Sequence, residues 1–255
     1  MDLRIQSLGH RYDDLEVLRD INLDVSAGEI VVLIGPSGCG KSTLLRMVGG
    51  LEQPSKGAVL QIGHEPKDSL NPLTYIFQDF ALLPWRTVEG NISLVLEDHS
   101  LSAQEVGAIV DDVLARTGLA DFRKAFPGQI SGGMKQRVAI ARALAVKPAV
   151  LLMDEPLSAL DSQTHELLMN DLIDLWVREK FTSVYVTHNL AEAVRIGHKV
   201  VVMSRRPGMI REIVEIDLSL EVRQARPELL LEQQQNLWAL MREEARAAEL
   251  ELVDG

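Results

Sequence analysis

Cysteine is almost absent from this sequence, since Cys39 is the single cysteine among 255 residues. A chain with one cysteine cannot form an internal disulfide bond, which fits a reducing compartment. No run of about 18 apolar residues occurs, and this excludes a transmembrane helix. The first ten residues, MDLRIQSLGH, lack the charged start and the apolar stretch of a signal peptide, so we expect a cytoplasmic protein.

Basic residues are scarce relative to acidic ones. Lys and Arg number 26 against 37 Asp and Glu, and the formal net charge is −11. DNA and RNA select basic surfaces, so this balance argues against nucleic acid as a partner. Apolar residues make up 46% of the chain, which is enough for a packed core in one large domain or two small ones.

Strands are predicted in the first third of the chain, where apolar and polar residues alternate. The segment GEIVVLIG, residues 28–35, is instead continuously apolar and ends in glycine, as a strand buried on both faces would. The predicted strands are 3–8, 15–25, 29–34, a short hairpin strand within 55–66, and 73–77, and a helix is predicted from 41 to about 49.

The pattern becomes helical between residues 88 and 146. Ser102 and Glu105 have the spacing of a capping box and predict a helix that runs to Gly118. A second helix should follow Ser131 and end before Pro148.

Strands return after this helical segment and alternate with helical stretches, at 149–154, 182–188 and 198–203. The alternation predicts βαβ units and a mostly parallel sheet. We therefore expect an α/β core made of residues 1–89 and 148–217, a helical subdomain inserted at 90–147, and an amphipathic helical tail at 218–255.

The segment GPSGCGKST, residues 35–43, matches a phosphate-binding loop between a predicted strand and a predicted helix. Its glycines let backbone N–H groups surround the β-phosphate, Lys41 can reach the β- and γ-oxygens, and Ser42 can hold Mg²⁺. The fold class is therefore a P-loop NTPase core with an N-terminal antiparallel β part and an inserted helical subdomain. The predicted ATP-binding residues here are Gly35, Pro36, Ser37, Gly38, Cys39, Gly40, Lys41, Ser42 and Thr43.

Cys39 lies close to a predicted helix N-terminus and to a lysine, and both features lower the pKa of a thiol. We therefore expect Cys39 to be reactive and its labelling to be slowed by MgATP.

Two acids follow the apolar strand VLLM. Asp154 lies where parallel-sheet enzymes place their ligands and is predicted to hold Mg²⁺. Glu155 can accept a proton from a water that attacks the γ-phosphate. The alternative is that the two acids only cap the strand.

A second anion site is indicated by Ser131, Gly132 and Gly133, because glycines at a helix N-terminus leave backbone N–H groups open to phosphate. The sequence offers one set of lysine, hydroxyl and acid, so both sites should contact the same triphosphate. That contact could arise within one chain or from a second copy.

These motifs together resemble the ATP-binding subunits of ABC transporters over nearly the whole chain. The segment ISGGMKQR resembles the family signature, with Ile130 where Leu is usual, LLMDEP resembles the Walker B strand, and SALD, residues 158–161, resembles the loop that crosses the dimer interface. The resemblance implies two copies that face head to tail and sandwich two ATP molecules, with the signature acting in trans.

The resemblance also implies roles for three isolated residues. Gln78 lies at the position that contacts Mg²⁺ and assists catalysis, His188 at the position that senses the γ-phosphate, and Tyr12 at the position that stacks on adenine. Their structural alternatives are a strand-end amide, a buried core histidine and an ordinary strand aromatic. Asn189 replaces the usual Asp after the histidine, and it suits a helix N-cap equally well.

The apolar loop ALLPW, residues 81–85, is either buried under the helical insertion or docks a helix of a membrane subunit, and a mixed role is favoured. The motifs LLPWRTVEGNI and SRRPGMI and the Trp238-containing tail resemble importers of nitrate, sulfonates and taurine.

The resemblance thus implies an ATPase at the inner face of the cell membrane, with transmembrane permease subunits as partners and a solute-binding protein as an indirect one. The competing functions are a soluble ABC ATPase that acts on DNA or ribosomes, and a regulatory module without turnover. The acidic charge disfavours the first, and Glu155 disfavours the second.

Overall fold

The computed structural model describes the backbone of residues 1–253 and the side chains of residues 1–242. The contacts of the chain group it into two units, residues 1–64 with 179–255, and residues 65–178. Strands β5 (Leu73–Ile76) and β6 (Val150–Asp154) and nearly all of helix α5 (Ser162–Glu179) belong to the second unit together with the helical segment. The division of the chain at 90 and 147 therefore stays a prediction.

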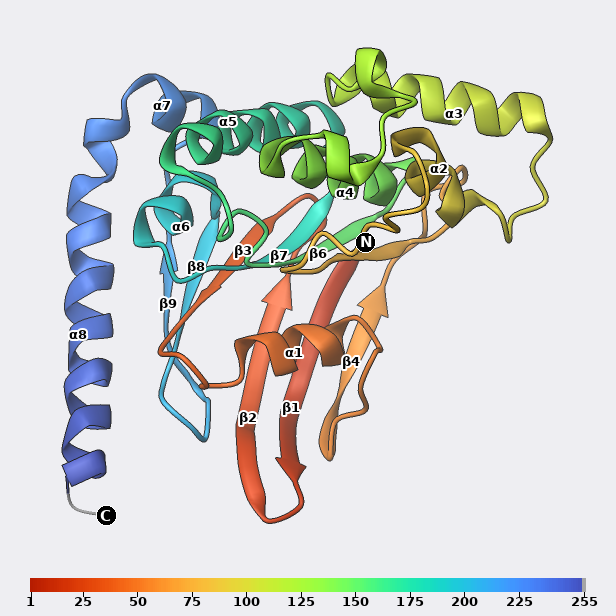
Figure 1. The fold of residues 1–255 in the computed structure, drawn as a ribbon. Helices are drawn as coiled ribbons and strands as arrows, with labels where there is room; N and C mark the ends of the chain where they lie inside the picture. The colour runs from red at the N-terminus through yellow and green to blue at the C-terminus, as the bar shows by residue number, and fades with distance from the viewer. Residues whose placement is uncertain (254–255) are drawn as a thin grey trace. The chain divides into compact units, whose positions relative to one another are not determined.

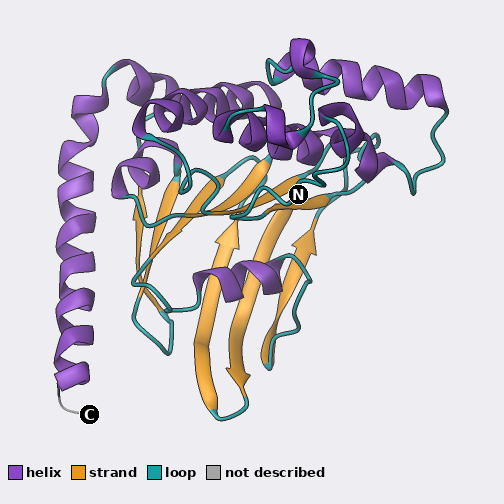
Figure 2. Cartoon of the chain, viewed as in Figure 1, coloured by secondary structure: helices purple, strands orange, loops and turns teal. Residues whose placement is uncertain are grey.

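The first unit contains an antiparallel sheet with the strand order β2-β1-β4 (Figure 2). It also contains strands in the order β7-β3-β8-β9, of which the first three are parallel and β9 is antiparallel to β8. The strands are β1 (Asp2–Tyr12), β2 (Leu15–Val25), β3 (Ile30–Ile34), β4 (Lys56–Ile62), β7 (Thr182–Val186), β8 (Lys199–Met203) and β9 (Ile210–Glu215).

The continuous apolar strands form the core of this unit. All five residues of β3 and all five of β7 are buried, which confirms the expectation drawn from GEIVVLIG. Strand β9 was not predicted, because its exposed charged residues hide the alternation of an edge strand.

The helices of the first unit are α1 (Lys41–Val48), α6 (Leu190–Ile196), α7 (Leu220–Ala225), the 3-10 turn η4 (Pro227–Leu230) and α8 (Leu231–Val253) (Figure 1). Helix α1 confirms the helix expected after the glycine loop. Leu230 and Leu237 are buried and Met241 is half-buried, so the tail is amphipathic as far as its side chains are described.

The second unit pairs the short parallel strands β5 (Leu73–Ile76) and β6 (Val150–Asp154). Its helical elements are α2 (Val88–Ser93), η1 (Leu94–Leu96), α3 (Ala103–Arg116), η2 (Ala120–Phe122), η3 (Pro127–Gln129), α4 (Gly132–Ala145) and α5 (Ser162–Glu179). Ser102 and Glu105 form the reciprocal capping box that was expected at the start of α3.

Within residues 1–253, none of the helices combines the length and the apolar character that a membrane-spanning helix requires.

Candidate nucleotide-binding site

The glycine loop between β3 and α1 has a backbone that demands glycine. Gly38 and Gly40 have φ angles of 75° and 103°, in the left-handed region that side chains disfavour. A Cβ atom on Gly40 would lie 2.8 Å from Cδ2 of Leu18. Gly40 is also the N-cap of α1. Because glycine has no side chain, it does not cap the N–H groups in the first turn of this helix.

Lys41 is buried over this loop, with 7% of its surface exposed. Its ammonium donates hydrogen bonds to the carbonyl oxygens of Gly35, at 2.9 Å, and Pro36, at 3.0 Å. These two carbonyls hold the Lys41 ammonium at the loop. Phosphate oxygens of a bound nucleotide could replace the carbonyls as hydrogen-bond acceptors of this ammonium. Ser42 and Thr43 follow in the first turn of α1.

The expectation of a reactive Cys39 was wrong. The side chain is buried, and burial raises the pKa of the thiol although the nearby Lys41 ammonium acts in the opposite direction. Desolvation of the thiolate therefore outweighs the lysine, and Cys39 stays a neutral thiol at pH 7. Its sulfur fills the space beside Gly35, where an added Cβ would lie 2.9 Å away.

Tyr12 ends strand β1 beside the first turn of α1 and has 41% of its surface exposed. Its phenol forms hydrogen bonds with Glu52 and Thr43; burial and the carboxylate of Glu52 raise the pKa of Tyr12. The ring of His10 packs edge-on against the Tyr12 ring, with centroids 4.6 Å apart and planes at 82°. The Tyr12 ring is thus fixed next to the phosphate loop while part of it faces solvent.

His10 and Glu52 support Tyr12 and were not singled out from the sequence. Nε2 of His10 lies 3.3 Å from Oε1 of Glu52, which is an ion-pair distance when the ring is protonated. Nδ1 of His10 lies 3.3 Å from Oγ of Ser55. The period of β1 places His10 and Tyr12 on the same face, which is the signal that could have identified His10.

His188 follows β7 and is exposed, so the alternative of a buried core histidine is excluded. Asn189 is the N-cap of α6, and its Oδ1 accepts hydrogen bonds from the N–H groups of Ala191, at 2.9 Å, and Glu192, at 3.4 Å. The carboxylate of Glu192 accepts a hydrogen bond from the phenol of Tyr185 at 2.8 Å. Asn189 therefore serves the capping role expected for it.

In the second unit, Asp154 ends strand β6 and Glu155 begins a turn. Glu155 has φ 46°, a left-handed conformation that costs a residue other than glycine on the order of 1–3 kcal/mol. Its carbonyl accepts hydrogen bonds from Ser158, from the N–H at 3.2 Å and from Oγ at 2.9 Å. The phenol of Tyr75, which the sequence analysis did not select, donates to Oδ2 of Asp154 at 3.0 Å.

Gln78 is exposed and lies two residues beyond β5, which ends at Ile76 rather than at residue 77. The backbone just after it is held by Arg142 of α4, whose guanidinium donates to the carbonyls of Ala81, at 2.6 Å, and Phe80, at 3.1 Å. Burial lowers the pKa of Arg142. Gln78 therefore lies at the start of a loop that is anchored to the helix α4.

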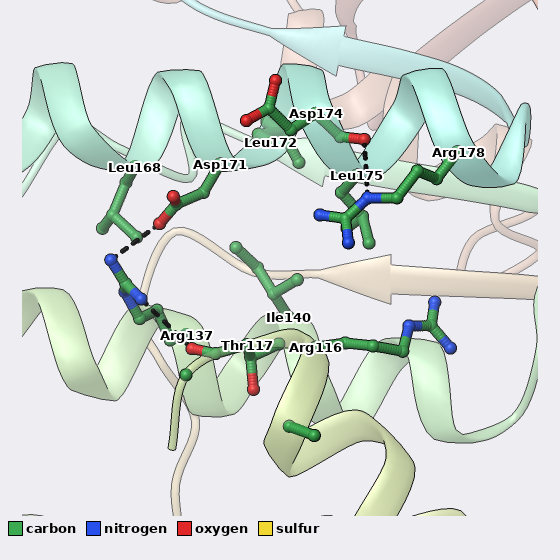
Figure 3. A pocket seen from close by; sticks show the side chains of 12 residues that line it. Arg116, Thr117, Arg137, Ile140, Leu168, Asp171, Leu172, Asp174, Leu175 and Arg178 are labelled. Carbon is green, nitrogen blue, oxygen red and sulfur yellow. Dashed lines mark hydrogen bonds and ion pairs between the residues drawn. The ribbon is translucent and has the colours of Figure 1, made fainter. Parts of the chain in front are cut away.

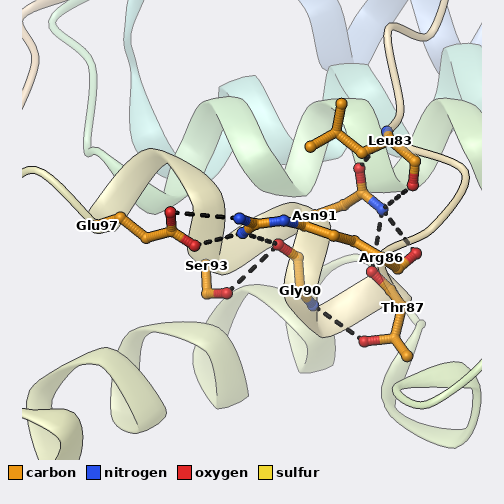
Figure 4. A network of polar contacts seen from close by, with 7 residues as sticks. All are labelled: Leu83, Arg86, Thr87, Gly90, Asn91, Ser93 and Glu97. Atoms are coloured by element: carbon orange, nitrogen blue, oxygen red, sulfur yellow. Dashed lines mark hydrogen bonds and ion pairs between the residues drawn. The ribbon is translucent and has the colours of Figure 1, made fainter.

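A buried asparagine organises the rest of this loop (Figure 4). Asn91 is fully buried, and its Oδ1 accepts the N–H of Leu83 at 2.7 Å. Its amide nitrogen donates to the carbonyls of Leu83, Arg86 and Thr87 at 3.0–3.1 Å. Within this fixed loop the side chain of Trp85 is 71% exposed.

Ser131 is the N-cap of α4, and its Oγ accepts the N–H of Met134 at 3.3 Å. Gly132 is exposed, whereas Gly133 is buried. A Cβ atom on Gly133 would lie 2.3 Å from Cγ2 of Thr164 in α5, so this glycine is required for the packing of the two helices. Gly133 therefore has a packing reason in addition to its expected anion-binding role.

A separate cavity of about 260 Å³ lies further along α4, between this helix, the C-terminal end of α3 and α5 (Figure 3). Arg137 crosses it, donating to the carbonyl of Thr117 at 3.2 Å and pairing with Asp171 at 2.7 Å. None of the predicted nucleotide-site residues lines this cavity. Arg137, the last residue of ISGGMKQR, instead ties α4 to both of its neighbours.

Among the described side chains, no group of three or more His, Cys, Asp or Glu residues is arranged to hold a metal ion. Mg²⁺ does not require such a group, because it usually binds through one or two carboxylates plus substrate phosphates. Asp154, at the end of β6, offers one such carboxylate in the second unit, and Ser42, in the first turn of α1, offers a hydroxyl in the first unit.

A buried strand that leads through a glycine loop with a buried lysine into a helix defines a P-loop nucleotide-binding protein. Residues 18–158 match the family described as ABC transporter. The chain therefore belongs to the ABC transporter family, as its ATP-binding cassette, and it is an ATPase.

Relatives with known sequences and structures agree with this assignment. The chain is 47% identical to the uncharacterized ABC transporter ATP-binding protein MJ0412 of Methanocaldococcus jannaschii, over 80% of this chain and 76% of that protein. It is 42% identical to the aliphatic sulfonates import ATP-binding protein SsuB of Bacillus anthracis, over 80% of each. The dimeric ATP-binding cassette MJ0796 bound to ADP and Pi has a TM-score of 0.73 and 31% identity, over 85% of this chain and all of that chain.

Proposed function

We propose that this cassette is the ATP-hydrolysing subunit of an importer for a small solute of the nitrate, sulfonate or taurine kind. Its partners would be a second copy of itself, transmembrane permease subunits and, indirectly, a solute-binding protein, at the inner face of the cell membrane. The sulfonate importer names of relatives at 42% identity support the transport class. The dimeric state of the similar cassette supports the pairing of two copies.

The roles of the residues follow from their chemistry. Backbone N–H groups of the glycine loop and the ammonium of Lys41 would bind the β- and γ-phosphates, and Tyr12 would stack on adenine. Glu155 would accept a proton from the attacking water, with His188 and Gln78 contacting the γ-phosphate region. The left-handed backbone at Glu155, closed by Ser158, supports this role, because strained residues cluster at active sites.

Asp154, Ser42 and Gln78 would hold Mg²⁺ with ATP. The ion would neutralise negative charge on the phosphate oxygens of ATP. A head-to-tail dimer would bring Ser131, Gly132 and Gly133 of one copy to the ATP of the other, so that ATP binding closes the pair and hydrolysis reopens it.

The observation that carries the partner assignment is the exposed Trp85 on a loop whose backbone is fixed by Asn91. Leu82 and Leu83 are half-buried, so the loop has the mixed role favoured from the sequence. A preorganised exposed tryptophan is a common anchor of protein interfaces, because it buries a large area at little entropic cost. The same loop begins at Gln78, so a partner docked on Trp85 would be linked directly to the candidate catalytic site.

This assignment is tested by purifying the complete importer with Trp85→Ala. We expect loss of the cassette from the detergent-solubilised complex, while ATP binding by the isolated cassette stays unchanged. Trp238→Ala is the matched control, because Trp238 is 60% exposed on α8. A Trp85→Ala cassette that stays in the complex like wild type would refute the docking role.

The solute is identified by a second experiment. Nitrate, sulfonates and taurine are each tested for stimulation of ATPase activity in the intact complex.

A further inference from the structure

The phenol of Tyr75 is positioned by strand register against the end of the neighbouring strand. Strands β5 and β6 are parallel, and Tyr75 is the partner of Leu152. Side chains two residues apart lie on the same face of a strand, so Leu152 and Asp154 share the face of Tyr75. The phenol extends forward along this face and donates its proton to Oδ2 of Asp154 at 3.0 Å.

Two contacts restrict the position of this phenol. The ring of Phe77 lies on the same face, with its centroid 4.4 Å from that of Tyr75 and the planes at 33°. The hydrogen bond then fixes the rotation of the Asp154 carboxylate, a torsion that is otherwise broad and weakly determined. Tyr75 therefore sets the plane in which the carboxylate oxygens lie.

We propose that Tyr75 is a positioning residue that orients the Asp154 carboxylate for the metal ion of MgATP. The proposal rests on the proposed role of Asp154 as a metal ligand. Ligating carboxylates are commonly held by an outer hydrogen-bond donor, and removal of that donor typically reduces metal affinity by about 10–100-fold. The purely structural alternative is that the bond only closes the end of a short strand pair.

Tyr75→Phe separates the two explanations, because phenylalanine keeps the ring that packs on Phe77 and removes only the hydroxyl. The binding of trinitrophenyl-ATP is measured in EDTA and across a range of Mg²⁺ concentrations. Mn²⁺ binding in the presence of a non-hydrolysable ATP analogue is measured by electron paramagnetic resonance. We expect unchanged nucleotide affinity in EDTA and an increase of about 10–100-fold in the half-saturating concentration of either metal.

Tyr185→Phe is the matched control. It removes a phenol that donates to the carboxylate of Glu192 at 2.8 Å, in the other unit of the chain and outside the candidate site. This control should leave the metal titrations unchanged. Thermal unfolding of each variant reports the cost to the fold in the same samples.

Asp154→Asn, measured alongside Tyr75→Phe, separates a failure of the role of Tyr75 from a failure of the metal role of Asp154. Metal affinity within twofold of wild type in Tyr75→Phe, together with loss of metal binding in Asp154→Asn, overturns the role of Tyr75 alone. Unchanged metal binding in Asp154→Asn overturns the metal role of Asp154. An equal fall of nucleotide affinity with and without metal in Tyr75→Phe shows a structural role and also overturns the proposal.

Discussion

Replacing Gly133 by alanine should disrupt the packing of α4 against α5. The added Cβ would lie 2.3 Å from Cγ2 of Thr164, whereas carbon atoms in contact prefer about 3.5–4.0 Å. Thr164 is not free to turn away, because Asp161 accepts its N–H at 3.1 Å and also forms a hydrogen bond with its side chain. The helices would therefore have to separate.

The expected size of the effect follows from two opposing contributions. Overpacking of this kind costs about 1–3 kcal/mol, and alanine in place of glycine returns up to about 1 kcal/mol of helix propensity. The 2.3 Å contact places the overpacking cost toward the upper end of its range, so we expect a net loss of about 1–2 kcal/mol in the free energy of unfolding. In a protein of this size that loss lowers Tm by about 2–8 °C, measured by circular dichroism.

Thr164→Ser tests the stated cause, because serine lacks Cγ2 and keeps the hydroxyl that pairs with Asp161. The double variant Gly133→Ala/Thr164→Ser should recover the Tm of Thr164→Ser alone. Gly133→Ala with the stability of wild type, or a double variant without recovery, would show that this contact does not explain the glycine. If stability recovers and ATPase activity does not, Gly133 also serves the nucleotide directly.

Three further results are expected. Cys39 should react with maleimide more slowly than an ordinary exposed thiol, because burial raises its pKa, and the rate should rise with pH beyond the usual thiol range; rapid labelling at pH 7 would contradict the burial. Glu155→Gln should keep the shape of the site but lose the base, so MgATP should trap a dimer that sizing chromatography detects; wild-type hydrolysis would remove Glu155 from the mechanism. In that background, mixing Lys41→Ala with Ser131→Arg under subunit exchange should restore one intact site and ATP-dependent dimerisation. A mixture that dimerises no better than either parent, although exchange occurs, would place Ser131 outside the partner's ATP site.

Local signals identified most of the elements of the candidate site. The glycine loop, the capping box of α3 and the N-caps Ser131 and Asn189 depend on residues within about four positions of one another, and the structure confirms their geometry. The apolar strand before the loop is buried as its composition predicted. Strand β9 escaped prediction because an exposed edge strand carries charges that mask its period.

The sequence by itself thus determined the family, the order of the motifs and the residues expected to bind phosphate, because each of these depends on short contiguous segments. Only the tertiary structure decided that Cys39 is buried, that Gly133 is required by Thr164, and that Tyr75 contacts Asp154. The contact between Tyr75 and Asp154 joins residues that are 79 positions apart in the sequence. Burial and cross-element contacts depend on how strands and helices pack, and no local pattern records which distant side chain will fill a given space.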